Sequence, residues 1–564
     1  MVVAIRADLA KITGAGHGLG REMALRFGKL GAVVVSVDIK REGNEETVKI
    51  IKNNGGKAYS YGCDVTDRTA VFNLEEKVKK EVGEVSILVN NAGIMPSQPI
   101  LLWTEEKVRS TVEINFIGHI WMIQAFLPSM KARNHGHIVA ISSMTGHVGL
   151  RNLVPYCGTK FAIRGVMESL QTELYQESNG NSQIKFTTIC PYMLNTGLCK
   201  KPRIRFQDKM KMVEPGDAAD QIVDAVRRDV LEISIPGNMH YTNRGYENLV
   251  KAEKDKLSKA DAVEIITLVL ELIWTLIKVH VENIRCVYKA IVPNEPKDIR
   301  GEIALITGAG HGMGREMALR FGKLGAVVVC VDINAKGNEE TVKMIKDKGG
   351  KAHIYECDVT DRAAVFNLAD KVKKEVGDVS ILVNNAGIMP SQPLLLWTEK
   401  NIRSTIDINL TANLWMIQAF LPSMKERNHG HIVAMSSMAG LIGFKNLVPY
   451  CGTKFAVRGV MEALENELFD ETEGNSKIKF TTVCPYMVNT GLCKNPRIRF
   501  QDHMKMVEAG DAADQIIDAM RRDIQEISIP GSMHYMNRFL TAFLSRSANR
   551  IMNTFVGASV EAHE

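Results

Sequence analysis

The chain has 564 residues, of which 45% are hydrophobic and 24% are charged, a composition typical of folded globular domains. A net charge of +6 is small for this length and does not indicate a nucleic-acid-binding protein. The ten cysteines show no CxxC or metal-ligand spacing, and the first residues do not form a cleavable signal peptide. We therefore expect free thiols in a reducing environment and no metal site.

The first part of the chain is repeated in the second. TGAGHGLGREMALRFGKLGA at 13–32 returns as TGAGHGMGREMALRFGKLGA at 307–326, and the match continues without a gap to residues 244 and 538. About three in four residues are identical at this constant offset. Each copy is long enough to bury its own core. We therefore expect a first domain (copy one), a linker, a second domain (copy two) and a tail, at 1–245, 246–298, 299–540 and 541–564.

Within each copy, short β-branched runs alternate with amphipathic stretches. Nearly continuous apolar character of the short runs indicates a parallel sheet covered on both faces, and the amphipathic stretches are typical of crossover helices. The sequence predicts two tandem doubly wound α/β domains joined by an apolar helical linker. In copy two, the runs read as buried strands are 303–307, 326–332, 379–387, 430–437 and 479–485.

The first expected strand differs between the copies at one position. Lys11 stands in copy one where copy two has Leu305. A lysine in the central strand of a parallel sheet is costly unless its ammonium group reaches water. Unless it does so, either this edge of copy one is imperfect or its N-terminus has been altered.

A glycine-rich turn follows the first strand and opens a helix in each copy. Glycines let the backbone approach a pyrophosphate, whose charge is favoured at the helix N-terminus, as in Rossmann-type dinucleotide sites. The turn consists of Thr13, Gly14, Gly18 and Gly20 in copy one, and of Thr307, Gly308, Gly312 and Gly314 in copy two.

An aspartate ends the second expected strand of each copy, Asp38 in the first and Asp332 in the second. A carboxylate at this place can accept hydrogen bonds from the adenosine ribose hydroxyls and would repel a 2′-phosphate. NAD is therefore favoured over NADP. In copy one, Lys40 and Arg41 replace Asn334 and Ala335, which leaves NADP open there.

A serine, a tyrosine and a lysine recur at fixed spacing in both copies, as Ser143, Tyr156 and Lys160 and as Ser437, Tyr450 and Lys454. Tyrosine and lysine four residues apart lie on one helix face, so the ammonium group can sit beneath the phenol. A nearby cation and an oxidised nicotinamide both favour the phenolate. The serine could then hold a substrate oxygen while the tyrosine exchanges its proton.

These motifs together resemble the short-chain dehydrogenase/reductase superfamily over most of each copy. The resemblance implies an oxidoreductase of CH–OH groups and a proton relay through Asn115 and Asn409. It also implies that the CDVTD and NNAG segments and a later threonine line the cofactor site. These further cofactor residues are Asp64, Asn91, Gly93 and Thr196 in copy one, and Asp358, Asn385, Gly387 and Thr490 in copy two.

Finer motifs, including LVPYCGTKFA, AFLPSM and NTGL, are similar to the membrane-associated retinol and 17β-hydroxysteroid dehydrogenase branch. That branch implies lipophilic alcohols such as retinoids, sterols or fatty alcohols, and endoplasmic reticulum or lipid-droplet membranes with cytosol-facing domains. Apolar side chains that could line such a pocket, or could equally be core, are Met95, Met144 and Met193, with Met389, Met438 and Met487 in copy two.

Between the copies lies a mostly apolar segment, Ala260–Pro293, which occupies the place of the N-terminal anchor of that branch. Glu264, Glu271 and Lys278 recur every seven residues and form a polar stripe. This makes the segment a weak candidate for a membrane span. It fits better an interfacial membrane helix, or else a helix packed against the two domains.

The copies differ at four positions near the expected active site, which predicts different substrate preferences. His147 corresponds to Leu441, Leu150 to Phe444, Phe116 to Leu410 and Ile117 to Thr411. The linker is long enough for the two domains to form an intrachain pseudo-dimer, and a homodimer is the other possibility.

The leading hypothesis is a tandem NAD-dependent dehydrogenase of lipophilic alcohols and ketones at a membrane. Two alternatives remain. One is a soluble reductase of small carbonyls; the other is a lipid-droplet or scaffold protein in which a copy has lost activity, against which the intact Ser-Tyr-Lys arrays argue.

Overall fold

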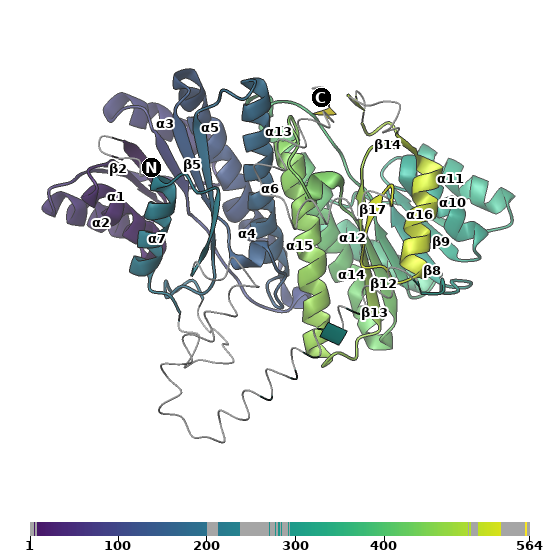
Figure 1. Cartoon of the computed structure of the whole chain (residues 1–564). Helices are drawn as coiled ribbons and strands as arrows, with labels where there is room; N and C mark the ends of the chain where they lie inside the picture. Colours follow the sequence, from purple (N-terminus) through teal and green to yellow (C-terminus); the bar gives the residue numbers. More distant parts are fainter. Residues whose placement is uncertain are drawn as a thin grey trace.

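Each half of the chain is a three-layer α/β domain, as the sequence predicts. The computed structural model describes residues 8–199, 212–236, 294–493 and 506–531, with a few isolated positions outside these ranges (Figure 1). Each domain contains a seven-stranded parallel sheet, with strand orders β3-β2-β1-β4-β5-β6-β7 and β10-β9-β8-β11-β12-β13-β17. Most of the expected linker at 246–298 and of the tail at 541–564 lies outside the described residues.

The first domain alternates strands with helices along the chain, and helices cover both faces of its sheet (Figure 1). Its strands are β1 (Leu9–Thr13), β2 (Val33–Asp38), β3 (Lys57–Gly62), β4 (Ile87–Asn90), β5 (Gly136–Ile141), β6 (Ile184–Pro191) and β7 (Glu232–Ile235). Its helices are α1 (Gly18–Lys29), α2 (Arg41–Asn53), α3 (Arg68–Glu81), α4 (Glu105–Val112), α5 (Gly118–Arg133), α6 (Val154–Glu177) and α7 (Pro215–Arg227).

The second domain repeats this order. Its main strands are β8 (Ile303–Thr307), β9 (Val327–Asp332), β10 (Lys351–Glu356), β11 (Ile381–Asn384), β12 (Gly430–Met435), β13 (Ile478–Pro485) and β17 (Glu526–Ile529). Its helices are α10 (Gly312–Lys323), α11 (Ala335–Asp347), α12 (Arg362–Glu375), α13 (Glu399–Ile406), α14 (Ala412–Arg427), α15 (Val448–Glu471) and α16 (Ala509–Arg521).

The strands expected for copy two are present, with two differences. The expectation that a strand continues to residue 387 is wrong, because β11 ends at Asn384 and the following residues turn away from the sheet. The two edge strands, β10 and β17, were not expected. β10 exposes Lys351 and Glu356, so it lacks the continuous apolar run that marks a strand buried on both faces.

The two domains pack on each other through their longest helices. α6 and α15 lie side by side between the two sheets (Figure 1). Glycines permit the close approach: a side-chain carbon at Gly165 would press on the ring of Phe455, and one at Gly459 on the ring of Phe161. The described parts of the two halves therefore share one continuous apolar core across this contact.

Polar bonds accompany this packing in both directions. The Gln124 amide donates to the backbone oxygens of Leu394 and Trp397, at 2.8 and 2.9 Å. Gln418, the equivalent residue of copy two, donates to the oxygens of Ile100 and Trp103, both at 2.8 Å. The repeat relationship is therefore preserved in the contact between the halves.

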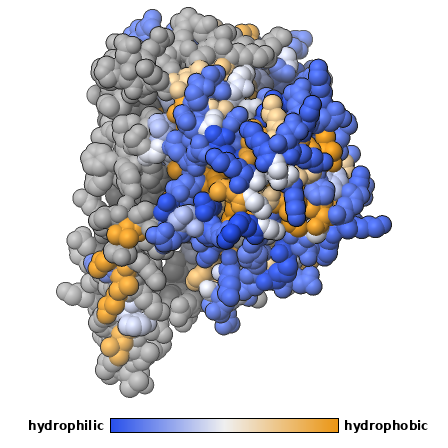
Figure 2. All heavy atoms as spheres, turned by 90° about the vertical axis from the view of Figure 1, so that its right-hand side faces the viewer, coloured by the Kyte–Doolittle hydropathy of each residue, from blue (hydrophilic) through white to orange (hydrophobic). Residues whose placement is uncertain are grey.

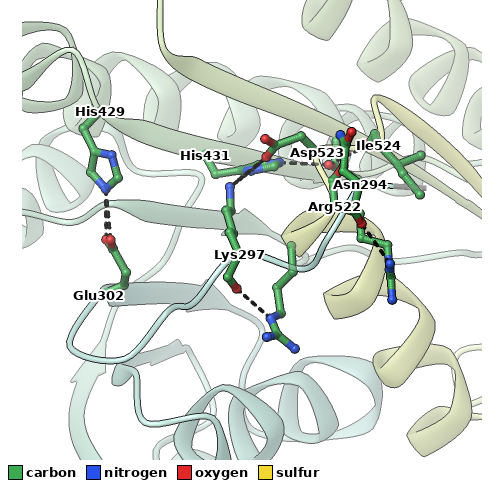
Figure 3. Close-up of polar contacts among 10 residues, drawn as sticks. Asn294, Lys297, Glu302, His429, His431, Arg522, Asp523 and Ile524 are labelled. Atoms are coloured by element: carbon green, nitrogen blue, oxygen red, sulfur yellow. Dashed lines mark hydrogen bonds and ion pairs between the residues drawn. The ribbon is translucent and has the colours of Figure 1, made fainter. Parts of the chain in front are cut away.

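The segment that leads into copy two is fastened to that domain by a polar cluster (Figure 3). Lys297 Nζ donates to His431 Nδ1 at 2.7 Å and to Asp523 Oδ1 at 2.9 Å. Burial, together with the nearby Lys297 charge, lowers the pKa of His431 well below its usual value, so the ring stays neutral. Arg521 bonds the backbone oxygen of Lys297 and Asn294 bonds that of Arg522, which fixes the entry of the chain.

Lys11 does not reach water. Its side chain is fully buried in β1, where its ammonium group contacts the Met122 sulfur and lies 4.6 Å from the centre of the Phe126 ring. β1 nevertheless pairs in register with β2 and β4, so the strand itself is regular. Burial lowers the pKa of Lys11 from 10.5 to about 7. Copy one therefore carries a buried, costly cation where copy two carries Leu305.

Replacing Lys11 with leucine should stabilise the chain. The folded state holds the Lys11 proton less tightly than the unfolded state, so the cost is complete below pH 7 and falls as pH rises toward 10.5. A drop from 10.5 to about 7 corresponds to about 5 kcal/mol at neutral pH. We expect Lys11→Leu to raise the free energy of unfolding in urea by up to this amount at pH 7 and by much less at pH 10.

The reverse change in copy two provides the matched control for this prediction. Leu305→Lys should destabilise the chain at pH 7, with a loss that shrinks as pH rises. An equal gain from Lys11→Leu at pH 7 and pH 10 would mean that packing, and not the buried charge, sets the cost.

Candidate active site

The predicted site residues gather at one edge of each sheet. Thr13, Asp38 and Asn90 end β1, β2 and β4, while Ser143 and Thr196 follow β5 and β6. Parallel strands place their carboxyl ends at the same edge, which is where doubly wound folds bind ligands. The same holds for copy two, so the structure brings each predicted set together.

The glycine-rich turn is packed too tightly for other residues. Gly14 and Gly18 have φ angles of +65° and +54°, and their counterparts Gly308 and Gly312 have +68° and +55°. A side-chain carbon at Gly314 would collide with the backbone oxygen of Gly308. The turn therefore lies directly against the start of α10, where its N–H groups can face a pyrophosphate.

Asp38 and Asp332 are almost fully buried and fixed by backbone donors. Gly16 N donates to Asp38 Oδ2 at 2.8 Å, and Lys40 N donates to Oδ1 at 2.9 Å. The equivalent distances to Asp332 are 2.7 and 2.8 Å, from Gly310 and Asn334. Each carboxylate thus links the glycine turn to the end of the second strand and keeps lone pairs for a further donor.

Other predicted cofactor residues bond within the protein. Asn91 Nδ2 donates to the Thr13 oxygen at 2.8 Å, and its backbone N–H donates to Thr13 Oγ1 at 2.9 Å, which ties β1 to β4. Asp64 Oδ1 accepts from Thr66 N at 2.9 Å and is exposed. Thr196 lies beside Gly18. Each is repeated in copy two, by Asn385 with Thr307, by Asp358 with Thr360, and by Thr490 with Gly312.

The tyrosine and lysine of each array lie on the first turns of α6 or α15. Lys160 Nζ is 5.5 Å from the centre of the Tyr156 ring and donates to the Ile141 oxygen at 2.9 Å. Lys454 has the same distance to Tyr450 and donates to the Met435 oxygen at 2.8 Å. The last strand residue before the catalytic serine region therefore anchors each lysine beneath its tyrosine.

The serine hydroxyl of each copy donates to a backbone oxygen, Ser143 to Pro191 at 3.3 Å and Ser437 to Pro485 at 3.4 Å. Burial raises the pKa of both phenols and outweighs the neighbouring serine, which acts to lower it. Burial also lowers the pKa of Lys160 and Lys454 to about 8. The protein environment by itself therefore keeps the phenols protonated at neutral pH.

A π-helical turn at residues 113–117 presents Asn115 to the site. Its Oδ1 accepts from Ile94 N, and its Nδ2 donates to the Ile94 oxygen, both at 2.8 Å. The Asn115 oxygen also lies close to Gly93, where Lys160 Nζ approaches as well. Asn409 sits in the equivalent turn at 407–411 with the same bonds to Ile388. The irregular turn thus aims each asparagine at the NNAG loop and the lysine.

A cavity of about 150 Å³ joins these features in copy two. It runs from the glycine turn past the Ser-Tyr-Lys array to an apolar wall. Its polar lining includes Asn385, Ser437, Tyr450, Lys454 and Thr490, and its apolar lining includes Met389, Met438, Phe444, Leu447, Met487 and Leu492. The three methionines predicted for a copy-two pocket therefore line this cavity. A dinucleotide and an apolar substrate would meet at the tyrosine in such a space.

One of the four expected substrate-pocket differences, Phe116 in copy one and Leu410 in copy two, lies elsewhere. The ring of Phe116 packs on Gly452 of the other half, and Leu410 lies near Gly158, so both belong to the contact between domains. Sequence position next to Asn115 suggested the pocket, but the π-helical turn points these side chains outward from it. Phe444 does line the copy-two cavity.

His147 lies near two possible metal ligands. Its Nε2 is 3.3 Å from Glu232, and ligand atoms of His147, Cys190 and Glu232 lie within 4.8 Å of one another. Arg164 already pairs with the Glu232 carboxylate at 3.2 Å. Because Arg164 already balances the charge of that carboxylate, we interpret the cluster as an Arg164–Glu232 ion pair with His147 beside it.

The nine cysteines in the described part of the chain are free thiols.

The sequence did not reveal the glutamates that cross between the halves. Glu173 and Glu467 are 2% and 1% exposed, and each bonds two backbone N–H groups of the other half. The sequence did contain a signal for them, which is a glutamate repeated in both copies near the end of the helix that carries the tyrosine and the lysine. The sequence does not reveal which groups these carboxylates bind, because their partners are brought close only by the contact between α6 and α15.

Comparison with known proteins identifies the family. The short chain dehydrogenase family model matches residues 8–205 and again residues 302–499. The chain therefore belongs to the short-chain dehydrogenase family, as a tandem duplication, and is an oxidoreductase of CH–OH groups.

Its relatives each match about half of the chain. Human epidermal retinol dehydrogenase 2 is 39% identical over 269 residues, which is 48% of this chain and 86% of the relative. Human 17-beta-hydroxysteroid dehydrogenase 13 is 38% identical over 297 residues, 52% of this chain and 96% of the relative. Mouse estradiol 17-beta-dehydrogenase 11 is 38% identical over 264 residues, covering 47% and 87%.

Solved structures of single-domain proteins also match. A Burkholderia phymatum short chain dehydrogenase/reductase in complex with NAD has a TM-score of 0.39 and 24% identity, covering 44% of this chain and 95% of its own. A metagenomic short-chain oxidoreductase in complex with NADP has a TM-score of 0.35 and 25% identity, covering 41% and 98%.

Alanine at Gly314 should abolish dinucleotide binding in copy two alone. Its side-chain carbon would force the glycine turn away from α10 and displace the N–H groups that face a pyrophosphate. Titration of the whole chain with NADH, followed by fluorescence, should then saturate at half the wild-type stoichiometry. Gly62→Ala is the control, because open space surrounds Gly62 and copy two has Glu356 there. Unchanged stoichiometry in Gly314→Ala would contradict this assignment.

Proposed function

We propose that the chain is a nicotinamide-dependent dehydrogenase of lipophilic alcohols, with one Ser-Tyr-Lys site in each half. The observation that carries this proposal is the copy-two cavity, where the glycine turn, Ser437, Tyr450 and Lys454 meet a wall of methionine, leucine and phenylalanine. The buried tyrosine lies between the glycine turn and the apolar wall. This arrangement suits hydride transfer to or from an apolar alcohol.

Each residue of the array has a distinct task in this proposal. The Ser437 hydroxyl and the Tyr450 phenol hold the substrate oxygen, and Tyr450 takes the alcohol proton during oxidation or returns it during reduction. Lys454 is buried beneath the ring, and its protonated ammonium group stabilises the phenolate form of Tyr450. Asn409 holds the NNAG loop against the site through its two bonds to Ile388. Ser143, Tyr156, Lys160 and Asn115 have these tasks in copy one.

A nicotinamide dinucleotide fits the residues present and would supply the hydride acceptor or donor. The turns at Gly14–Gly20 and Gly308–Gly314 would hold its pyrophosphate. Asp38 and Asp332, each fixed by two backbone donors, would bind its ribose hydroxyls, which favours NAD. Lys40 and Arg41 follow Asp38 in copy one, so NADP is the alternative cofactor there.

The apolar cavity wall and the relatives favour retinoids, steroids or fatty alcohols over small carbonyls. Human epidermal retinol dehydrogenase 2 and 17-beta-hydroxysteroid dehydrogenase 13 align with nearly their full length. We further propose that the two halves act as an intrachain pseudo-dimer, which the packing of α6 on α15 supports. The domain boundaries at 245, 298 and 540 belong to this proposal.

Association with an endoplasmic reticulum or lipid-droplet surface is the proposed location. Among the described residues, no helix has the length and apolarity needed to cross a membrane. In the segment between the halves, the described helical positions include five exposed apolar side chains spaced by three or four residues, which places them on one face. They are Leu270, Trp274, Ile277, Val281 and Ile284. An apolar strip is visible at the lower left of Figure 2, to the left of a largely hydrophilic domain surface.

Charged residues in this face should weaken membrane binding. We expect Trp274→Glu with Ile277→Glu to reduce co-flotation with phosphatidylcholine vesicles by at least about tenfold, because both side chains are about half exposed and would lie in the interface. Leu396→Glu is the matched control, since Leu396 is an equally exposed leucine on the copy-two domain. Equal flotation of all three proteins would favour the soluble alternative.

Removal of the two phenols tests the catalytic proposal. Tyr156→Phe and Tyr450→Phe should each lower kcat of their own half by about 10²–10⁴-fold, and the double variant should be inactive. Activity is measured as NAD-dependent oxidation of retinol, a 17β-hydroxysteroid and a long-chain alcohol by the whole chain. Tyr175→Phe, which installs the residue that copy two has as Phe469, is the control. Full activity in the double variant, or none in the wild type on any alcohol, would overturn the proposal.

A further inference from the structure

The loop between the catalytic serine and tyrosine of each half is held by the other half. In copy two this loop, residues 438–447, contributes Met438, Phe444 and Leu447 to the cavity wall. Gly443 N donates to Glu168 at 3.0 Å, and the Phe444 oxygen accepts from the Ser169 hydroxyl. Both of these partners lie on α6, a helix of copy one.

Glu173, one turn farther along α6, binds two segments of copy two with a single carboxylate. Its Oε1 accepts from Leu394 N at 2.8 Å, and its Oε2 accepts from Asn446 N at 2.9 Å. Asn446 has a φ angle of +65°, and its backbone oxygen accepts a hydrogen bond from Gln392 N at 2.9 Å. It stands four residues before Tyr450. The carboxylate therefore closes a turn that leads directly into the catalytic helix.

The same arrangement runs in the other direction. Glu467 of α15 accepts from Ile100 N at 2.7 Å and from Asn152 N at 2.8 Å. Asn152 has φ of +62° and stands four residues before Tyr156. Glu462 accepts from Gly149 N at 3.1 Å. Each half thus supplies glutamates to the loop of the other.

These hydrogen bonds are buried, and each loop packs closely against the opposite helix. Glu173 is 2% exposed and Glu467 is 1% exposed. A side-chain carbon at Gly149 or Gly443 would collide with the backbone of the opposite helix, so each loop lies directly on that helix. A buried backbone N–H that loses its acceptor is costly, and a glutamine could replace only one of the two acceptor atoms.

We infer that Glu173 is a positioning residue for the copy-two site and Glu467 for the copy-one site, so that the loop between the serine and the tyrosine of each half is positioned in trans by the other half. This inference rests on the proposed function of the two Ser-Tyr-Lys sites. It predicts a specific pattern: a change on α6 alters the pocket of copy two, although α6 carries the tyrosine of copy one.

The two cross-contacts are not identical. Ser169 corresponds to Ala463, and Asn466, which donates to the Gly149 oxygen at 2.8 Å, corresponds to Thr172. Copy one holds the copy-two loop with a hydroxyl, whereas copy two holds the copy-one loop with an amide. Two identical chains would make the same contacts in both directions, whereas two halves joined in one polypeptide can differ in this way.

Kinetics in singly active chains separate the two directions. In the Tyr156→Phe chain, where only copy two can turn over, Glu173→Gln should raise KM for a lipophilic alcohol about tenfold with a smaller change in KM for NAD. In the Tyr450→Phe chain, Glu467→Gln should do the same for copy one. Glu177→Gln is the control, because this α6 glutamate pairs with Lys131 of its own half. An unchanged KM in both chains would overturn the inference.

Hydrogen exchange tests the same inference without turnover. Glu173→Gln in the otherwise unaltered chain should speed amide exchange in peptides covering 440–447, while peptides covering 146–153 keep the wild-type rate. If no alcohol is oxidised but this pattern appears, the proposed function fails and the loop contact stands. If Glu173→Gln does not fold, Ser169→Ala, which installs the residue of copy two, should still speed exchange at 440–447. Wild-type exchange there would overturn the inference.

Discussion

The structure depends on the packing of α6 against α15. These helices carry Tyr156 with Lys160 and Tyr450 with Lys454, and the same helices form the contact between the halves. Their first turns face the cofactor edge of each sheet, while their later turns bind the loops of the opposite domain. The position of each Tyr-Lys pair and the contact between domains are therefore set by the same two elements.

Much of the fold and site could be predicted from the sequence because their determinants are local. Continuous apolar runs reveal buried strands, and the glycine turn, Asp332 and the Ser437-Tyr450-Lys454 spacing depend on residues near one another along the chain. Edge strands were missed because β10 buries only Ala352 and Tyr355 and so has no continuous apolar run. Phe116 was misplaced because its direction depends on a π-helical turn that neighbouring residue types do not reveal.

Contacts between distant segments could not be predicted in this way. Glu173 meets Leu394 and Asn446, more than two hundred positions along the chain, and no spacing rule links them. A repeated glutamate in an apolar helix indicates only that the carboxylate needs a partner. The identity of the partner follows from the crossing of α6 and α15, which is a property of the assembled pair.

Duplication within one chain also allows the halves to diverge. In a dimer of identical chains, a buried Lys11 would appear in both subunits, and its cost would be doubled. Here only copy one carries the lysine, and copy two has Leu305 at the same position in β8. Phe444 similarly lines the copy-two cavity, while Leu150 stands at the equivalent position of copy one. Each half always packs on the same, covalently joined partner. A residue can therefore differ between the two halves without having to fit a contact with an identical copy of itself.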